Sequence, residues 1–292
     1  MMGHCWSKRG AQHECEVNMM IASLILTLSI PTLALPARGV SAPRASAPSA
    51  QRQDPEPDPK ENPDKRPEVK EMVDGLKKLV GQRGDQDKQA IEMIDRMLAE
   101  YPKSGVKDRA AMCKALSKIF EARRKDLEPG VPDNSLYLAT GTALGLMGPE
   151  SAAILTKWIG HKKHRKDLAL QRVLVLSLGK TRDEKSVRVL VGLLQDKDAI
   201  IVGAAAEALG EYAGKPLKLR KDSFESMLKV LMSARGAVDS DLNDTVARER
   251  YDVIAAPLIT SMQVLSGHDE RKPNGWQYWW NKNKKKNWDR ED

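Results

Sequence analysis

A leucine followed by a small residue recurs along the chain and ends helical stretches of the sequence. The leucines are Leu116, Leu144, Leu178, Leu209 and Leu265, at spacings of 28, 34, 31 and 56 residues. A repeat of this length predicts a chain of helix pairs, because each pair can bury its apolar face only against a neighbouring pair. The long last interval leaves room for an enlarged pair.

The composition supports a helical protein with a packed core. Hydrophobic residues make up 41% of the 292 residues and charged residues 30%, which excludes disorder of the whole chain. Aromatic residues are only 4%, and phenylalanine occurs twice. Strands favour aromatic and β-branched residues, so a large β-sandwich or barrel is excluded and helices are expected.

The clearest repeat unit spans residues 183–210. Its first helix is expected over residues 183–194, and Asp196 or Asp198 is expected to cap a second helix over residues 199–210. Gly210 is expected to end that second helix, in the usual C-terminal position of glycine.

This unit resembles a HEAT repeat, in the short form of the bilin-lyase-like subclass. The resemblance covers about residues 105–267 and is strongest over residues 168–213. It implies an all-α fold, an α/α superhelix of four or five helix pairs in which the second helices line a concave face. Two features depart from the family pattern. Gly203 lies inside a helix, and Pro257 is expected to kink the second helix of the long unit at residues 215–267.

The N-terminal sequence predicts export. Residues 19–35 are apolar and uncharged, Lys8 and Arg9 precede them, and small residues follow, which is the order of a secretory signal. We therefore expect residues 1–37 to be a signal peptide, and the mature protein to begin between Leu35 and Ala42 in a secreted or periplasmic location. The alternative is an uncleaved N-terminal segment that anchors the protein in a membrane.

Three further regions follow this leader. Residues 38–67 are rich in proline and poor in apolar residues, so we expect a disordered, extended linker. Residues 68–267 form the predicted HEAT-like repeat domain, and residues 268–292 a tryptophan-rich capping segment with a basic tail.

Two basic clusters are candidate polyanion-binding sites. The side chains concerned are Lys162, Lys163, Arg165, Lys166, Lys284, Lys285 and Lys286. Lysine and arginine at this density attract phosphate or other anionic groups. We expect the first cluster, which also holds His161 and His164, to be a solvated turn between helices, with binding of a polyanion or an anionic surface as the functional alternative.

The C-terminal tryptophans form a W-x-x-W-W pattern that resembles the terminal segment of exported bacterial HEAT-repeat proteins. Trp276, Trp279 and Trp280 share one helical face. We expect this face to pack on the helix that carries four apolar residues, Ile254, Leu258, Ile259 and Met262, and so to cover the end of the repeat array. A platform on which sugars stack is the alternative.

No motif predicts catalysis or a cofactor. The Gly-Lys-Thr at residues 179–181 lacks the upstream glycine of a phosphate-binding loop, and the acidic residues 239–243 lack the glycine and glutamate of a calcium loop. Without the leader only Cys113 remains, so neither an intrachain disulfide nor a cysteine-based zinc site is expected. We therefore expect no catalytic residues, no metal ligands and no cofactor. A HEAT-like lyase or glycosylase remains an open alternative.

Together these features predict an exported, non-enzymatic HEAT-repeat scaffold that binds another protein. The alternative function is binding of a polyanion or cell-wall glycan by the basic turns and the C-terminal tryptophans.

Overall fold

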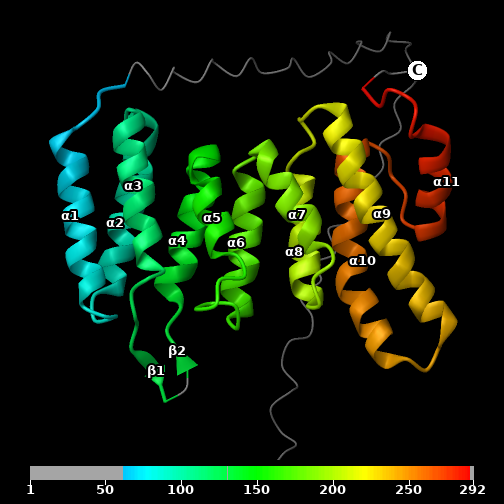
Figure 1. Ribbon diagram of the computed structural model, residues 1–292, viewed down its shortest axis with the longest axis horizontal. Coiled ribbons are helices and arrows are strands. Elements are labelled where there is room, and N and C mark those ends of the chain that lie inside the picture. Colours follow the sequence, from blue (N-terminus) through cyan, green and yellow to red (C-terminus); the bar gives the residue numbers. More distant parts are fainter. Residues whose placement is uncertain (1–61, 130, 290–292) are drawn as a thin grey trace, which may run out of the picture. The chain divides into compact units, whose positions relative to one another are not determined.

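The computed structural model describes residues 62–129 and 131–289 (Figure 1). All of them belong to a compact unit of residues 55–292. The predicted signal peptide, and the predicted linker up to residue 61, lie outside the described residues.

The described residues form eleven α-helices, one short β-hairpin and three single 3₁₀ turns. The α-helices are α1 (Pro67–Gly81), α2 (Asp87–Glu100), α3 (Val106–Ile119), α4 (Ser135–Leu146), α5 (Ala152–Trp158), α6 (Leu168–Lys180), α7 (Val187–Leu193), α8 (Ala199–Gly210), α9 (Leu217–Ser240), α10 (Thr245–Ser266) and α11 (Pro273–Asn283). The 3₁₀ turns span Tyr101–Lys103, Gly148–Ser151 and Glu184–Ser186. In the hairpin, β1 (Asp126–Glu128) pairs antiparallel with β2 (Val131–Pro132). The predicted all-α class is confirmed.

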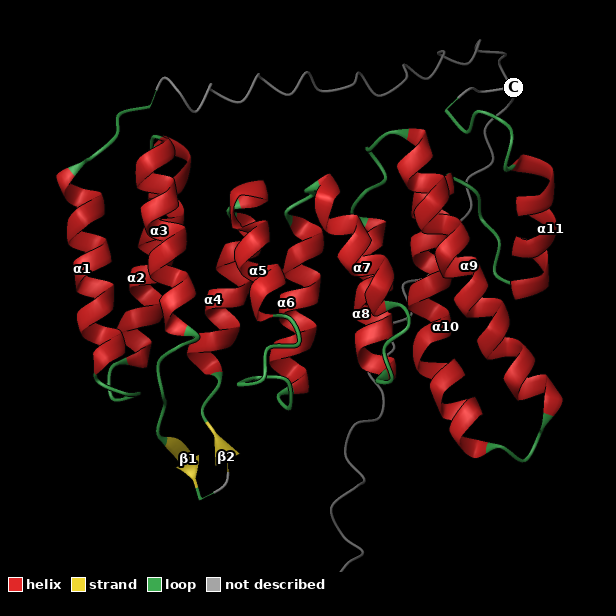
Figure 2. Cartoon of the chain, viewed as in Figure 1, coloured by secondary structure: helices red, strands yellow, loops and turns green. Residues whose placement is uncertain are grey.

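The first ten helices form five consecutive pairs in two layers. Each odd-numbered helix from α1 to α9 contacts the helix that follows it, and α2, α4, α6, α8 and α10 contact one another in that order. The turns within the pairs lie along one edge of this row (Figure 2). The repeat of about 30 residues in the sequence therefore corresponds to one helix pair, with α9 and α10 as the enlarged last pair.

The glycines of the leucine-glycine motif lie at or next to helix ends, as predicted for Gly210, the last residue of α8, and they also serve helix packing. Gly145, Gly179 and Gly210 all have ordinary negative φ. A methyl group on Gly145 would lie 2.8 Å from the Cβ of Ser177, and one on Gly179 only 2.6 Å from the Cα of Ala208. Glycine is therefore needed because successive second helices cross in near contact.

These contacts also revise two of the five marker positions. Gly145 packs beside Ser177, which directly precedes Leu178. Gly210 packs beside Ser261, which directly precedes Met262. In α10 the residue equivalent to Leu178 is therefore Met262, which lies one turn before the predicted marker Leu265. Leu116 lies in α3, a first helix, so it does not belong to the series of second-helix markers. The leucine and methionine side chains concerned are all buried.

The two irregularities noted in the sequence meet at one contact. α10 runs continuously through Pro257. A methyl group on Gly203 of α8 would lie 3.5 Å from the Cγ of Pro257 and 3.8 Å from the carbonyl oxygen of Val253. Proline leaves the carbonyl four residues before it without a helical hydrogen bond, and glycine opposite this site lets α8 approach the altered turn.

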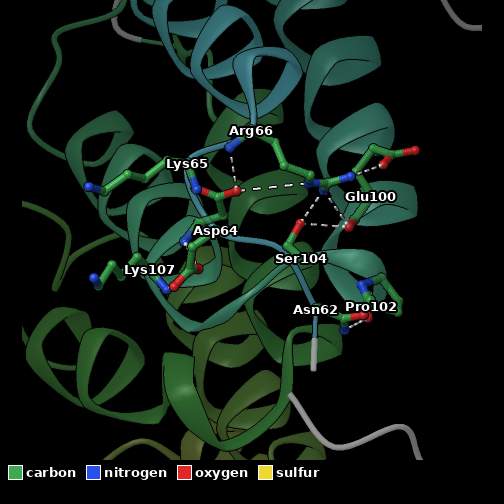
Figure 3. A network of polar contacts seen from close by, with 9 residues as sticks. Asn62, Asp64, Lys65, Arg66, Glu100, Pro102, Ser104 and Lys107 are labelled. Atoms are coloured by element: carbon green, nitrogen blue, oxygen red, sulfur yellow. Dashed lines mark hydrogen bonds and ion pairs between the residues drawn. The ribbon is translucent and has the colours of Figure 1, made fainter. Parts of the chain in front are cut away.

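Residues 62–66 do not behave as part of a free linker. The carboxylate of Asp64 accepts hydrogen bonds from the backbone N–H groups of Lys107 (2.8 Å) and Asp108 (3.3 Å) in the first turn of α3. The Asp108 carboxylate in turn accepts from the N–H groups of Lys65 (2.9 Å) and Arg66 (3.0 Å), just before α1. Each helix start is thus capped by a carboxylate from the other segment (Figure 3).

The side chain of Arg66 strengthens this junction. Its guanidinium donates to the Glu100 carboxylate at 3.1 Å and to the Ser104 hydroxyl at 2.6 Å (Figure 3). Residues 62–66, at the end of the predicted linker, are therefore attached to the start of α3 and the end of α2. None of the helices in the described part of the chain is long and apolar enough to cross a membrane.

Candidate binding surfaces

The exposed apolar residues concentrate on the second helices. Ten large apolar side chains are exposed among the described residues. Six of these lie on second helices: Leu146, Leu168, Ile200, Val246, Val253 and Val264. We call the solvent-facing side of α4, α6, α8 and α10 the second-helix face. Exposed apolar surface gathered in one region of a protein is typical of a site that another molecule covers.

Charged residues near this face are engaged with neighbouring elements. Arg172 of α6 pairs with Glu207 of α8 at 3.4 Å, a bridge between successive second helices. The guanidinium of Arg250 in α10 donates to the carbonyl oxygens of Asp196 and Lys197, both at 2.7 Å, in the turn before α8. These contacts connect neighbouring helices and the turn before α8.

A groove of about 670 Å³ lies at the C-terminal ends of α8 and α10. Its lining comprises Arg182, Glu207, Gly210, Glu211, Ala213, Gly214, Lys215, Thr260, Ser261 and Val264. Arg182 and Glu211 form an ion pair of 3.1 Å beside it. The mixture of carboxylates, cations and hydroxyls in its lining suits a polar peptide backbone.

Lys163, one of the predicted polyanion-binding cations, binds backbone carbonyl groups of a neighbouring helix end. Its ammonium donates to the carbonyl oxygens of Phe120 (3.1 Å), Glu121 and Ala122 (3.3 Å) at the end of α3. A lysine in this position satisfies helix C-terminal carbonyls and the negative end of the helix dipole. Burial, with the nearby guanidinium of Arg123, lowers the pKa of Lys163.

His164 corrects the expectation of a wholly solvated turn. Its side chain is buried, and its Nε2–H donates to the carbonyl oxygen of Phe120 at 2.8 Å. Its ring centroid lies 4.8 Å from that of Tyr137 and 5.7 Å from that of Trp158. The turn between α5 and α6 is therefore attached to α3 through two of its residues, and burial lowers the pKa of the imidazole.

The buried imidazole gives a pH-dependent contribution to stability. Since the pKa of His164 in the folded state lies below its unfolded value of about 6.5, the unfolded chain binds more protons, and stability should fall as pH drops below about 6.5. His164→Gln keeps an N–H donor for Phe120 but does not titrate. Thermal melts from neutral pH to about pH 5 should show a smaller loss of stability in the variant than in the wild type. An equal loss in both proteins would contradict this assignment.

Three cations that the sequence analysis did not select join the turn between α5 and α6. Lys157 pairs with Glu121 at 3.7 Å across α5 and the end of α3, and Arg123 is close enough to Lys163 to affect its pKa. Lys118 is exposed in the last turn of α3. We define the basic patch as the six exposed cations Lys118, Arg123, Lys157, Lys162, Arg165 and Lys166. Lys118 and Arg123 are distant in sequence from the cluster, whereas Lys157 lies in α5, five residues before Lys162.

The second basic cluster does not belong to this patch. Lys284, Lys285 and Lys286 follow α11, which α7 to α10 separate from α5 (Figure 1). Their side chains are exposed, while Lys221 of α9 donates to the carbonyl oxygens of Lys284 (2.9 Å) and Lys286 (2.5 Å). The structure therefore places the seven predicted cations in two separate regions.

The C-terminal tryptophans surround one phenylalanine. Phe224 of α9 has ring-centroid distances of 5.4 Å to Trp276, 5.4 Å to Trp279, 5.2 Å to Trp280 and 5.4 Å to Trp288. Trp276 and Trp280 are buried, and Trp279 is half-buried. The expectation that these rings pack mainly on α10 is wrong, because α11 packs on α9.

The segment after α11 is held on α9 as well. Arg220 forms an ion pair with Asp289 and donates to the carbonyl oxygen of Leu265 at 3.2 Å. Tyr278, whose side chain is 62% exposed, points away from the buried rings. Trp276 and Trp280 lie inside the protein and Trp279 and Trp288 are half-buried, which favours a packing role for this segment.

Two further features singled out in the sequence are Cys113 and the acidic residues 239–243. Cys113 is buried, and burial raises the pKa of its thiol to about 11. The acidic loop at residues 239–243 precedes α10, whose first turn Asp244 caps by accepting from the N–H of Ala247 at 2.9 Å. Within the described ranges, no group of three or more histidine, cysteine or acidic side chains is placed to hold a metal ion.

Comparisons with known proteins add no family. No protein-family model, no curated protein and no solved structure matches this chain.

Proposed function

We propose that this chain is an exported, non-enzymatic scaffold of the HEAT-repeat type, an α/α superhelix that binds another protein on its second-helix face. The observation that carries the proposal is the location of six of the ten exposed large apolar residues on α4, α6, α8 and α10. The five consecutive helix pairs and the near contacts at Gly145, Gly179 and Gly210 support the superhelix. Export rests on the sequence of residues 19–35.

The chemistry of the face indicates what kind of partner fits it. Ile200, Val253 and Val264 offer separate apolar contacts on successive helices. Because Arg172 and Glu207 pair with each other, a partner held by net charge gains little here. We therefore expect a protein segment whose apolar side chains follow the row of helices and whose backbone lies in the groove beside Val264.

The experiment is photo-crosslinking followed by measured binding. A photoreactive residue in place of Ile200 should capture a partner, and that partner, once purified, should bind the wild-type protein. Val264→Asp should weaken this binding by about tenfold or more, since a carboxylate in a closed apolar contact loses its hydration. Isothermal titration calorimetry gives the dissociation constants.

Val106→Asp is the matched control. Val106 is 50% exposed and Val264 is 52% exposed, but Val106 lies in the first turn of α3, outside the second-helix face. The control variant should bind as the wild type does. Equal weakening by both substitutions, with unchanged melting temperatures, would place the binding site elsewhere.

A further inference from the structure

We propose that the basic patch is a second interaction surface, which binds the anionic headgroups of a lipid bilayer. This inference does not depend on the second-helix face, because its residues lie on the first helices α3 and α5 and on the turns that follow them. It concerns how the protein is held at a surface, whereas the proposed scaffold function concerns a protein partner.

The first argument is the density of charge. The patch holds six exposed cations, and the only one of them in an ion pair within the described ranges is Lys157, whose ammonium lies 3.7 Å from the Glu121 carboxylate. Lys162, Arg165 and Lys166 have no ion-pair partner among the described residues. Like charges held together without partners attract a surface that carries many negative groups.

The second argument is that the patch is held in place. Lys163 and His164, in the middle of the turn, are bound to the carbonyl oxygens at the end of α3. The indole N–H of Trp158 reaches the Ser117 hydroxyl at 3.3 Å, which connects the end of α5 to α3. The cations on both elements are therefore presented together, so little ordering is needed when they meet a charged surface.

The third argument favours a bilayer over a nucleic acid as the ligand of the basic patch. Proteins that bind single strands place exposed aromatic rings among their cations. Here Phe120, Tyr137 and Trp158 are buried below the patch. The chain also carries the uncharged apolar run at residues 19–35, which takes it to a membrane whether it acts as a leader or as an anchor. A bilayer is thus the anionic surface nearest to this patch.

The test is co-flotation of the full-length protein with vesicles. The probes are vesicles of phosphatidylcholine alone and of phosphatidylcholine mixed equally with phosphatidylglycerol. The patch variant replaces Arg123, Lys162, Arg165 and Lys166 with glutamine. The wild type should bind the anionic vesicles more tightly than the neutral ones, and the patch variant should lose this preference, a change on the order of a thousandfold for four cations. High salt should remove the preference as well.

A matched variant separates the patch from net charge. It replaces Lys282, Lys284, Lys285 and Lys286 with glutamine, which removes the same charge from the C-terminal cluster. Both variants keep residues 19–35, so the contribution of the apolar run is the same in each. The matched variant should keep the preference for anionic vesicles, and circular dichroism should show that both variants are folded.

Three outcomes would overturn the proposal. Equal loss in the two variants would mean that net charge alone attracts the protein. Full retention by the patch variant would mean that other residues contact the lipid. Tight, salt-sensitive binding of duplex DNA without any preference for anionic vesicles would assign the patch to nucleic acid.

Discussion

Replacing Trp276 with alanine should lower the free energy of unfolding by about 3–5 kcal/mol, as the truncation of a fully buried tryptophan typically does. Trp276 has no exposed surface, and its ring packs against Phe224 at 5.4 Å and Trp279 at 5.7 Å. The substitution removes contacts on the side of α9 that α11 covers, and it leaves a cavity that the remaining rings fill only in part. Chemical denaturation followed by circular dichroism measures the change.

Tyr278→Ala is the control for this prediction. Tyr278 lies in the same helix, but its side chain is 62% exposed, so its removal should change the stability by less than about 0.5 kcal/mol. Tryptophan fluorescence of the folded protein should also be blue-shifted and poorly quenched by iodide. A Trp276 variant as stable as the Tyr278 variant would show that α11 contributes nothing to the fold.

Gly179→Ala should destabilise the protein by about 2–3 kcal/mol, although alanine normally stabilises a helix relative to glycine. The added methyl group would lie 2.6 Å from the Cα and 2.7 Å from the carbonyl oxygen of Ala208. Because both atoms belong to the backbone of α8, no side-chain rotation relieves the overlap, and α6 and α8 must move apart. The change is read from chemical denaturation.

Gly192→Ala, in contrast to Gly179→Ala, should not destabilise the protein. Gly192 lies in α7, and a methyl group there would meet no atom within 4 Å. This variant should be as stable as the wild type or more stable by up to about 1 kcal/mol, which is the difference in helix propensity. If the two alanine variants were equally stable, the near contact of the second helices would be refuted.

The sequence was sufficient to predict the elements that depend on local patterns. The spacing of apolar residues and the low aromatic content predicted helices, and the period of about 30 residues predicted their pairing. Asp198 could be assigned as a cap because an aspartate before an apolar run accepts from the first N–H groups of a helix, here that of Ile200 at 2.9 Å. These features involve residues that are close in the chain.

The candidate surfaces could be predicted only in part. Lys162, Arg165 and Lys166 were identified because they are consecutive or nearly so in the sequence. Arg123 joins them only because Lys163 and His164 attach the turn to the end of α3, more than 40 residues earlier. No local pattern carries that information, since it depends on where two helix pairs meet.

Only the tertiary structure shows which helices pack against each other. The tryptophan pattern predicted a packed segment, but its partner is Phe224 in α9 rather than the apolar face of α10. Likewise, the motif at Gly145, Gly179 and Gly210 was visible in the sequence, but the sequence did not show that these glycines let neighbouring helices pack in near contact. Periodicity specifies which side of a helix is apolar, whereas the distance between two helix backbones is set by the fit of side chains from both, and only the folded chain brings those side chains together.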